Sequence, residues 1–87
     1  MQIIYSPKAK EHLDFWIKTG NKTILKKTIQ LINAIISNPY KGIGNPEALK
    51  HELNGYWSRR INKEHRLIYK IDIDKNILKI YSLKGHY

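Results

Sequence analysis

Apolar residues recur along this chain at two different periods, and the change of period separates helices from strands. Residues 7–20 and 21–38 carry apolar side chains every three or four positions, which is the spacing of one helix face. Short runs rich in β-branched and aromatic residues, typical of strands, occupy residues 2–5, 56–61, 65–71 and 77–83. The pattern predicts a single α+β domain over residues 1–87 with the order β-α-α-β-β-β.

Capping residues mark the ends of both predicted helices. Ser6-Pro7 is a typical N-cap followed by proline at the first helical position, and Gly20 is a typical C-terminal glycine. Asn21 caps the second helix, which Asn38-Pro39 terminates. The apolar stripes expected to face a core comprise Ala9, Leu13, Trp16 and Ile17, then Ile24, Leu25, Leu31, Ile32, Ile35 and Ile36. We therefore expect two antiparallel helices on one face of a small antiparallel sheet.

Alternation along the strand at residues 65–71 assigns its side chains to two faces. One face takes Leu67, Tyr69 and Ile71, and the other takes Arg66, Ile68 and Lys70. Because the helices cover one face, the apolar set predicts the buried side and the charged set the open side.

A stretch without any period separates the second helix from the later strands. Residues 39–46 contain two glycines and two prolines but lack the Gly-Lys-Ser/Thr sequence of a phosphate-binding loop. Glu47 follows Pro46 directly. Its default interpretation is a residue of a first helical turn, favoured there by the helix dipole.

Composition excludes several classes of protein. The absence of cysteine rules out disulfides, thiolate catalysis and cysteine-ligated zinc, and fits a reducing cytoplasm. The first apolar run is too short for a signal peptide, and no window approaches the ~20 apolar residues of a membrane span. We expect a cytoplasmic protein without a membrane partner.

The charge points to a polyanionic partner. Sixteen Lys and Arg residues against seven Asp and Glu residues give a formal net charge of +9. Neutralising phosphates releases condensed counterions, so nucleic acid is the first candidate. An anionic membrane or an acidic protein would also match the charge.

The chain also contains the groups needed to cut RNA by attack of a 2'-hydroxyl. Such cleavage needs a base for the 2' proton, positive charge for the phosphorane, and an acid for the departing 5' oxygen. Glu47 is the candidate base, Arg66 the candidate cation and His86 the candidate acid, since histidine has a reference pKa of ~6.5. Tyr87 can stack on a base or place a hydroxyl against the phosphate. Further candidate RNA contacts are Lys50, Arg59 and Arg60.

Neither a metal nor a cofactor is expected. The remaining histidines lack metal-ligand spacing, and the scattered acids include no carboxylate pair for magnesium. Each catalytic assignment also has a structural alternative. A terminal His-Tyr is ordinarily a frayed end. The side chains of Arg59 and Arg60 point to opposite faces of the predicted strand, so at least one of them should be solvated or salt-bridged.

Four blocks in order carry a resemblance to a known family, namely Gly42–Leu53, Gly55–Ile61, Glu64–Tyr69 and His86-Tyr87. They resemble the Txe/YoeB family of bacterial toxins, a branch of the RelE/ParE superfamily, over essentially the whole chain. Two positions depart from its pattern, since Asn45 replaces a frequent lysine and Ala48 a common proline. Neither departure removes a candidate catalytic group.

The resemblance implies a ribosome-dependent mRNA endonuclease that cuts the codon in the A site of the 70S ribosome, and a cognate antitoxin that neutralises it. It matches Glu47 to the general base, Arg66 to the phosphate-stabilising arginine and His86 to the general acid. Tyr87 matches the accompanying terminal tyrosine, and Lys50 a supporting basic residue. Whether the toxin forms a homodimer is left open.

Two other functions remain open from the sequence. A ParE-type relative would inhibit DNA gyrase, and it is expected to lack the complete set of base, arginine and acid. A non-enzymatic basic domain would bind ribosomal or messenger RNA, and the charge, size and aromatic residues fit it equally well. The His86-Tyr87 end and the Glu47 loop favour catalysis.

Overall fold

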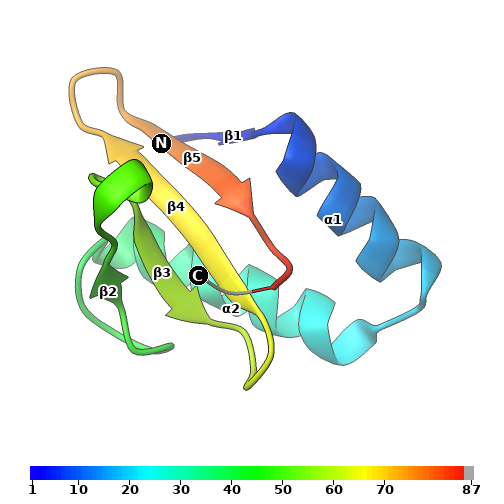
Figure 1. Ribbon diagram of the computed structural model, residues 1–87. Coiled ribbons are helices and arrows are strands. Elements are labelled where there is room, and N and C mark those ends of the chain that lie inside the picture. The colour runs from blue at the N-terminus through cyan, green and yellow to red at the C-terminus, as the bar shows by residue number, and fades with distance from the viewer. Residues whose placement is uncertain (86–87) are drawn as a thin grey trace.

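The computed structural model of the protein describes residues 1–85 and consists of a twisted sheet with two helices packed against it (Figure 1). Its elements are β1 (Gln2–Tyr5), α1 (Pro7–Lys18), α2 (Lys22–Ser37), β2 (Glu47–Ala48), the 3-10 turn η1 (His51–Leu53), β3 (Trp57–Arg60), β4 (Arg66–Asp72) and β5 (Ile77–Ser82). The α+β fold and the order of the predicted elements are confirmed. Neither helix in the described part of the chain is long and apolar enough to cross a membrane.

Both helices begin at the predicted caps. The Ser6 hydroxyl accepts a hydrogen bond from the Ala9 amide, and the Asn21 side chain accepts one from the Ile24 amide. The predicted apolar stripes are too wide, because Ile17 is 57% exposed and Ile36 is 42% exposed. Each of these residues directly follows a core-facing residue, and one step of about 100° around the helix turns it away from the sheet.

The sheet is mixed, with the strand order β1-β5-β4-β3-β2. β3, β4 and β5 form the predicted antiparallel meander, but β1 pairs in parallel with β5. The prediction of an entirely antiparallel sheet is therefore wrong at this edge. Whether β1 runs parallel or antiparallel to β5 depends on the path of the chain between them, and the residues of the two strands do not determine that path.

A short strand stands where a helical turn was the default interpretation. Glu47 and Ala48 form β2, which pairs antiparallel with β3 and places Glu47 opposite Ser58. The backbone groups of residues 47–48 therefore pair with the edge of β3, and they do not form the hydrogen bonds of a helical turn.

The core lies between the helices and one face of the sheet. Leu67 and Tyr69 are fully buried there and Ile71 packs against them, as the alternation predicted. Ile68, which the same alternation assigned to the open side, is also 0% exposed, so the prediction of an exposed position is wrong for this residue. Helix residues in this core include Trp16, Leu31 and Ile35. Figure 1 shows both helices on one side of the sheet, which leaves the opposite face of the sheet, here called the open face, without a helix.

Candidate active site

Arg59 is a structural anchor rather than an exposed RNA contact. Its side chain is 0% exposed. The guanidinium donates to the carbonyl oxygens of Asn38, Lys41 and Ile43, and its Nε donates to the Tyr69 hydroxyl at 3.3 Å. The prediction that Arg59 binds RNA is therefore wrong for this structure. Arg59 pairs with Leu67 and therefore points to the buried face of the sheet. Its hydrogen bonds hold the loop after α2 against the sheet, and the carbonyl dipoles of that loop stabilise its positive charge.

Burial of Arg59 fixes the path of the loop that leads to Glu47. Gly44 packs so closely that a Cβ there would lie 2.7 Å from Leu31 Cδ2. The Gly44 carbonyl accepts a hydrogen bond from the Arg60 amide. The chain then turns at Asn45, which has a φ of 51°, and enters β2. Glu47 is thus presented at the edge of the sheet with an exposed side chain.

The carboxylate of Glu47 accepts a hydrogen bond from a side chain of its own segment. The Asn45 side-chain amide donates to Glu47 Oε1 at 3.5 Å. Lys50, three residues after Glu47, is exposed and occupies the N-cap position of η1. The segment therefore offers an acceptor and a cation to a ligand that lies along β2.

Two arginines lie directly opposite each other on the open face. Arg60 of β3 pairs with Arg66 of β4, and like charges at opposed positions destabilise a sheet. Nη1 of Arg66 donates to the hairpin carbonyls of Asn62 at 2.9 Å and His65 at 3.3 Å. A phosphate placed between the two guanidinium groups would relieve their repulsion.

Glu47 and Arg66 share this face. Glu47 pairs with Ser58, and Arg66 pairs with Arg60, two residues further along β3. Directly paired residues point to the same side of a sheet, as do residues two apart. Adjacent strands lie ~4.8 Å apart and two residues advance ~6.7 Å, so about 12 Å separates the two Cα atoms. Two long side chains can reach one phosphodiester across that span.

The end of the described chain lies next to Arg66. The Arg66 amide donates to the Gly85 carbonyl at 2.8 Å. His86 and Tyr87, the predicted acid and its accompanying tyrosine, lie outside the described residues. The structure brings Glu47, Arg60 and Arg66 to one face, and it leads the chain to residue 85 at the same place.

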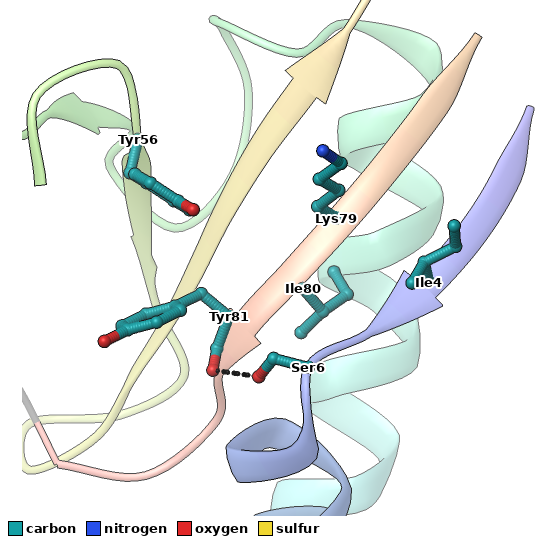
Figure 2. A pocket seen from close by; sticks show the side chains of 6 residues that line it. All are labelled: Ile4, Ser6, Tyr56, Lys79, Ile80 and Tyr81. Carbon is teal, nitrogen blue, oxygen red and sulfur yellow. Dashed lines mark hydrogen bonds between the residues drawn. The ribbon is translucent and has the colours of Figure 1, made fainter. Parts of the chain in front are cut away.

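The open face also carries two aromatic rings that were not predicted as a site. Tyr56 and Tyr81 have ring centroids 5.4 Å apart. Lys70 Nζ lies 5.4 Å from the Tyr56 ring and Lys8 Nζ lies 5.2 Å from the Tyr81 ring. A pocket of about 120 Å³ adjoins them, lined by Ile4, Ser6, Tyr56, Lys79, Ile80 and Tyr81 (Figure 2). Aromatic faces with ammonium groups can bind the bases and phosphates of single-stranded nucleic acid.

Comparison with known proteins decides the family. The model of the YoeB-like toxin of bacterial type II toxin-antitoxin systems matches residues 5–87. The chain is 50% identical over 76 residues to Toxin YoeB of Synechocystis sp., covering 87% of this chain and 86% of that protein. It is 41% identical over 87 residues to Toxin YoeB of Escherichia coli K12, covering 100% of both. The chain belongs to the YoeB-like toxin family.

Solved structures match the fold of this YoeB-like toxin. It superimposes on the YoeB/ParE toxin from Agrobacterium tumefaciens with a TM-score of 0.95 at 32% identity, covering 100% of both chains. It matches a chain of the heterotetrameric YoeB-YefM toxin-antitoxin complex from Staphylococcus aureus with a TM-score of 0.87 at 44% identity, covering 100% of this chain and 98% of that one. A YoeB dimer from the same organism gives a TM-score of 0.89 at 44% identity, again covering 100% of this chain and 98% of that one.

Sequence reasoning missed three groups near the chain end of the YoeB-like toxin. His12 and His65 were among the histidines considered only for their lack of metal-ligand spacing, and Trp16 was placed in the apolar stripe of the first helix. All three side chains contact the segment after β5. The four-residue spacing of His12 and Trp16 predicts that they share one face of α1. The sequence does not predict that both side chains bond the main chain of Leu83.

Proposed function

We propose that this toxin is a ribosome-dependent endoribonuclease that cuts mRNA in the ribosomal A site without a metal ion. The observation that carries the proposal is that Glu47 and Arg66 share the open face while Gly85 is hydrogen-bonded to Arg66. This arrangement supports a single site for base, cation and acid, because His86 follows Gly85 directly in the sequence. The proposed site of action is the cytoplasm, where translation takes place.

The proposed reaction uses the chain's own groups. Glu47 takes the proton from the 2'-hydroxyl, and the 2' oxygen attacks the neighbouring phosphorus. Arg66 donates to the non-bridging oxygens as negative charge develops on the phosphorane. The bond from phosphorus to the 5' oxygen breaks, and His86 protonates that oxygen. The products are a 2',3'-cyclic phosphate and a 5'-hydroxyl.

Other residues of the open face contact the RNA in this proposal. Arg60 and Lys50 contribute positive charge beside Arg66 and Glu47, Tyr87 stacks on a base or contacts the phosphate, and the Tyr56–Tyr81 pocket receives a neighbouring base. A solvated carboxylate is a weak base toward a hydroxyl. The Cα atoms of Glu47 and Arg66 are about 12 Å apart, so the substrate must be held between the two side chains. Orientation of the substrate by the ribosome accounts for the dependence on translation.

We further infer that a cognate antitoxin binds the toxin and covers the open face with acidic and apolar residues. The +9 charge favours an acidic partner. The Staphylococcus aureus relative is described in complex with YefM.

Primer extension on mRNA translated by purified ribosomes tests the nuclease proposal. We expect breaks within A-site codons, with 2',3'-cyclic phosphate and 5'-hydroxyl ends and no magnesium requirement beyond that of the ribosome. Glu47→Gln should slow cleavage by about 10²- to 10⁴-fold, because it removes the base while keeping the side chain's size.

Asp14→Asn is the matched control for this test, since it changes the net charge equally from an exposed position on α1. It should cleave like the wild type. Bound but intact mRNA would instead indicate a non-catalytic RNA-binding domain, and inhibition of DNA gyrase would indicate a ParE-type toxin. Ends bearing a 3'-hydroxyl would contradict the proposed chemistry.

A further inference from the structure

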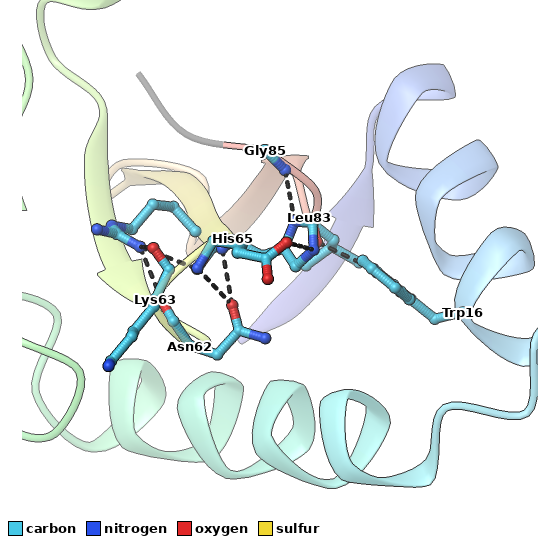
Figure 3. Close-up of polar contacts among 8 residues, drawn as sticks. Trp16, Asn62, Lys63, His65, Leu83 and Gly85 are labelled. Atoms are coloured by element: carbon cyan, nitrogen blue, oxygen red, sulfur yellow. Dashed lines mark hydrogen bonds and ion pairs between the residues drawn. The ribbon is translucent and has the colours of Figure 1, made fainter.

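Side chains, together with the Arg66 amide at the start of β4, hold the chain beyond the end of β5. The Leu83 amide donates to His12 Nδ1 at 3.1 Å, and the Leu83 carbonyl accepts from Trp16 Nε1 at 3.0 Å. The Gly85 amide donates to His65 Nδ1 at 2.9 Å. Figure 3 shows His65 below Gly85, with Trp16 reaching toward Leu83 from α1.

The three side chains also support one another. The rings of Trp16 and His65 meet edge to face with centroids 4.8 Å apart. Trp16 is 5% exposed and Leu83 is 0% exposed, so the contacts lie in the core rather than at a solvated end. On the same helix, Phe15 lies under the Lys84 ammonium, which is 4.0 Å from the ring centroid. Leu83, Lys84 and Gly85 therefore each make a contact of their own with a side chain of α1 or of the β3–β4 hairpin.

We propose that His12, Trp16 and His65 form a tail clamp that positions residues 83–85 against Arg66 and thereby sets the rate of RNA cleavage. The inference rests on the proposed function, because the clamped segment leads directly into His86, the proposed acid. The three are positioning residues, since they contact the protein's own main chain and act through it.

The clamp requires both imidazoles to be neutral. Each accepts an amide proton at Nδ1, so its own proton must sit on Nε2, whereas an imidazolium has two donors and no acceptor. The charged and titratable groups facing His12 are Lys8, Lys84, Glu11 and His65. Glu64 faces His65, with Oε2 4.0 Å from Nε2.

The surroundings of His12 keep it neutral near physiological pH. Burial lowers the pKa of His12 from 6.5, and the ammonium groups of Lys8 and Lys84 lower it further. The unfolded chain then binds more protons than the folded one as the pH falls below 6.5. The contribution of His12 to the clamp is fully present above that pH and is lost as the pH falls through the lower, folded value.

Amide exchange and cleavage, measured on the same variants of the full chain, test the tail clamp. His12→Leu and His65→Phe delete the acceptors, and Trp16→Phe deletes the donor. Loss of one such hydrogen bond should speed exchange at residues 83 and 85 roughly tenfold. Cleavage at saturating ribosome should slow roughly tenfold with little change in KM.

Conservative variants separate positioning from packing. His12→Asn and His65→Asn offer an amide oxygen near the position of Nδ1 and do not titrate, so they should recover most of the protection and rate. In the wild type, protection of the Leu83 amide should fall as the pH drops below 6.5, and His12→Asn should flatten that profile. Ile35→Val, a change in the core on α2 that leaves the hydrogen bonds of the clamp in place, is the control for lost stability and should keep both properties.

Several outcomes would overturn the clamp. Equal exchange and cleavage with leucine and with asparagine at position 12 would contradict it, as would wild-type exchange and cleavage in the acceptor-deleting variants. Imidazole nitrogen spectra of the wild type provide a test that needs no variant to fold, and a proton on Nδ1 of either histidine would contradict the proposal. If the wild type cuts no RNA, the proposed function fails, while exchange at residues 83 and 85 still decides whether the tail clamp exists.

Discussion

At the scale of single residues, Arg59 and Arg60 show how neighbours in a strand take unrelated roles. Arg59 points into the core and bonds three carbonyl oxygens and a tyrosine hydroxyl, whereas Arg60 is exposed on the open face opposite Arg66. The alternation of a strand predicts opposite directions for the pair. It does not predict that the loop after α2 supplies the acceptors.

We expect Arg59→Met to lower the free energy of unfolding by about 3 kcal/mol, because it leaves several buried acceptors without a donor. Arg60→Met is the matched control and should change stability by less than about 0.5 kcal/mol. Urea denaturation of both variants checks this. Equal losses in the two would show that the loop does not depend on the guanidinium of Arg59.

At the scale of elements, Ser6 joins α1 to β5. Its hydroxyl oxygen accepts from the Ala9 amide as an N-cap and also donates to the Tyr81 carbonyl at 2.7 Å. The start of α1 is therefore fixed relative to the open face, where Tyr81 lines the pocket. Asn21 caps α2 through the Ile24 amide.

We expect Ser6→Ala to cost about 2 kcal/mol, from the lost cap and the lost cross-element hydrogen bond together. Asn21→Ala removes a cap and should cost about 1 kcal/mol. Thermal or urea denaturation measures both. A smaller loss for Ser6→Ala than for Asn21→Ala would mean that the bond to Tyr81 adds nothing to stability.

At the scale of the whole molecule, positive charges far outnumber negative ones. Sixteen Lys and Arg residues against seven Asp and Glu residues give a net charge of +9. Self-repulsion on this scale destabilises a compact chain and favours an oppositely charged partner.

Salt should therefore stabilise the isolated toxin. Raising the ionic strength from ~0.01 M to ~0.15 M shortens the Debye length from ~30 Å to ~8 Å, so the Tm should rise. A complex with an acidic antitoxin should gain less, because its opposite charges attract. Thermal denaturation in sodium chloride, with sucrose as the uncharged control, measures the difference. A Tm of the isolated toxin that does not respond to salt would contradict the argument.

Local chemistry made much of the fold predictable. Both helix starts followed from capping side chains within three residues of the amides they bind, as at Ser6 and Asn21. The buried face of β4 followed from the period of two along one strand. The residue blocks that carry the family resemblance were likewise readable, and the family is confirmed. The catalytic roles of Glu47, Arg66 and His86 remain predictions.

The sequence by itself determined the helices, the meander and the family, because each depends on neighbouring residues or on residue identity alone. Only the tertiary structure decided the parallel pairing of β1, the strand at Glu47, the burial of Arg59 and the side-chain contacts of residues 83–85. Each of these brings together groups that are far apart in the chain, such as His12 with Leu83. Their partners are set by how the packed layers meet, which no local pattern specifies.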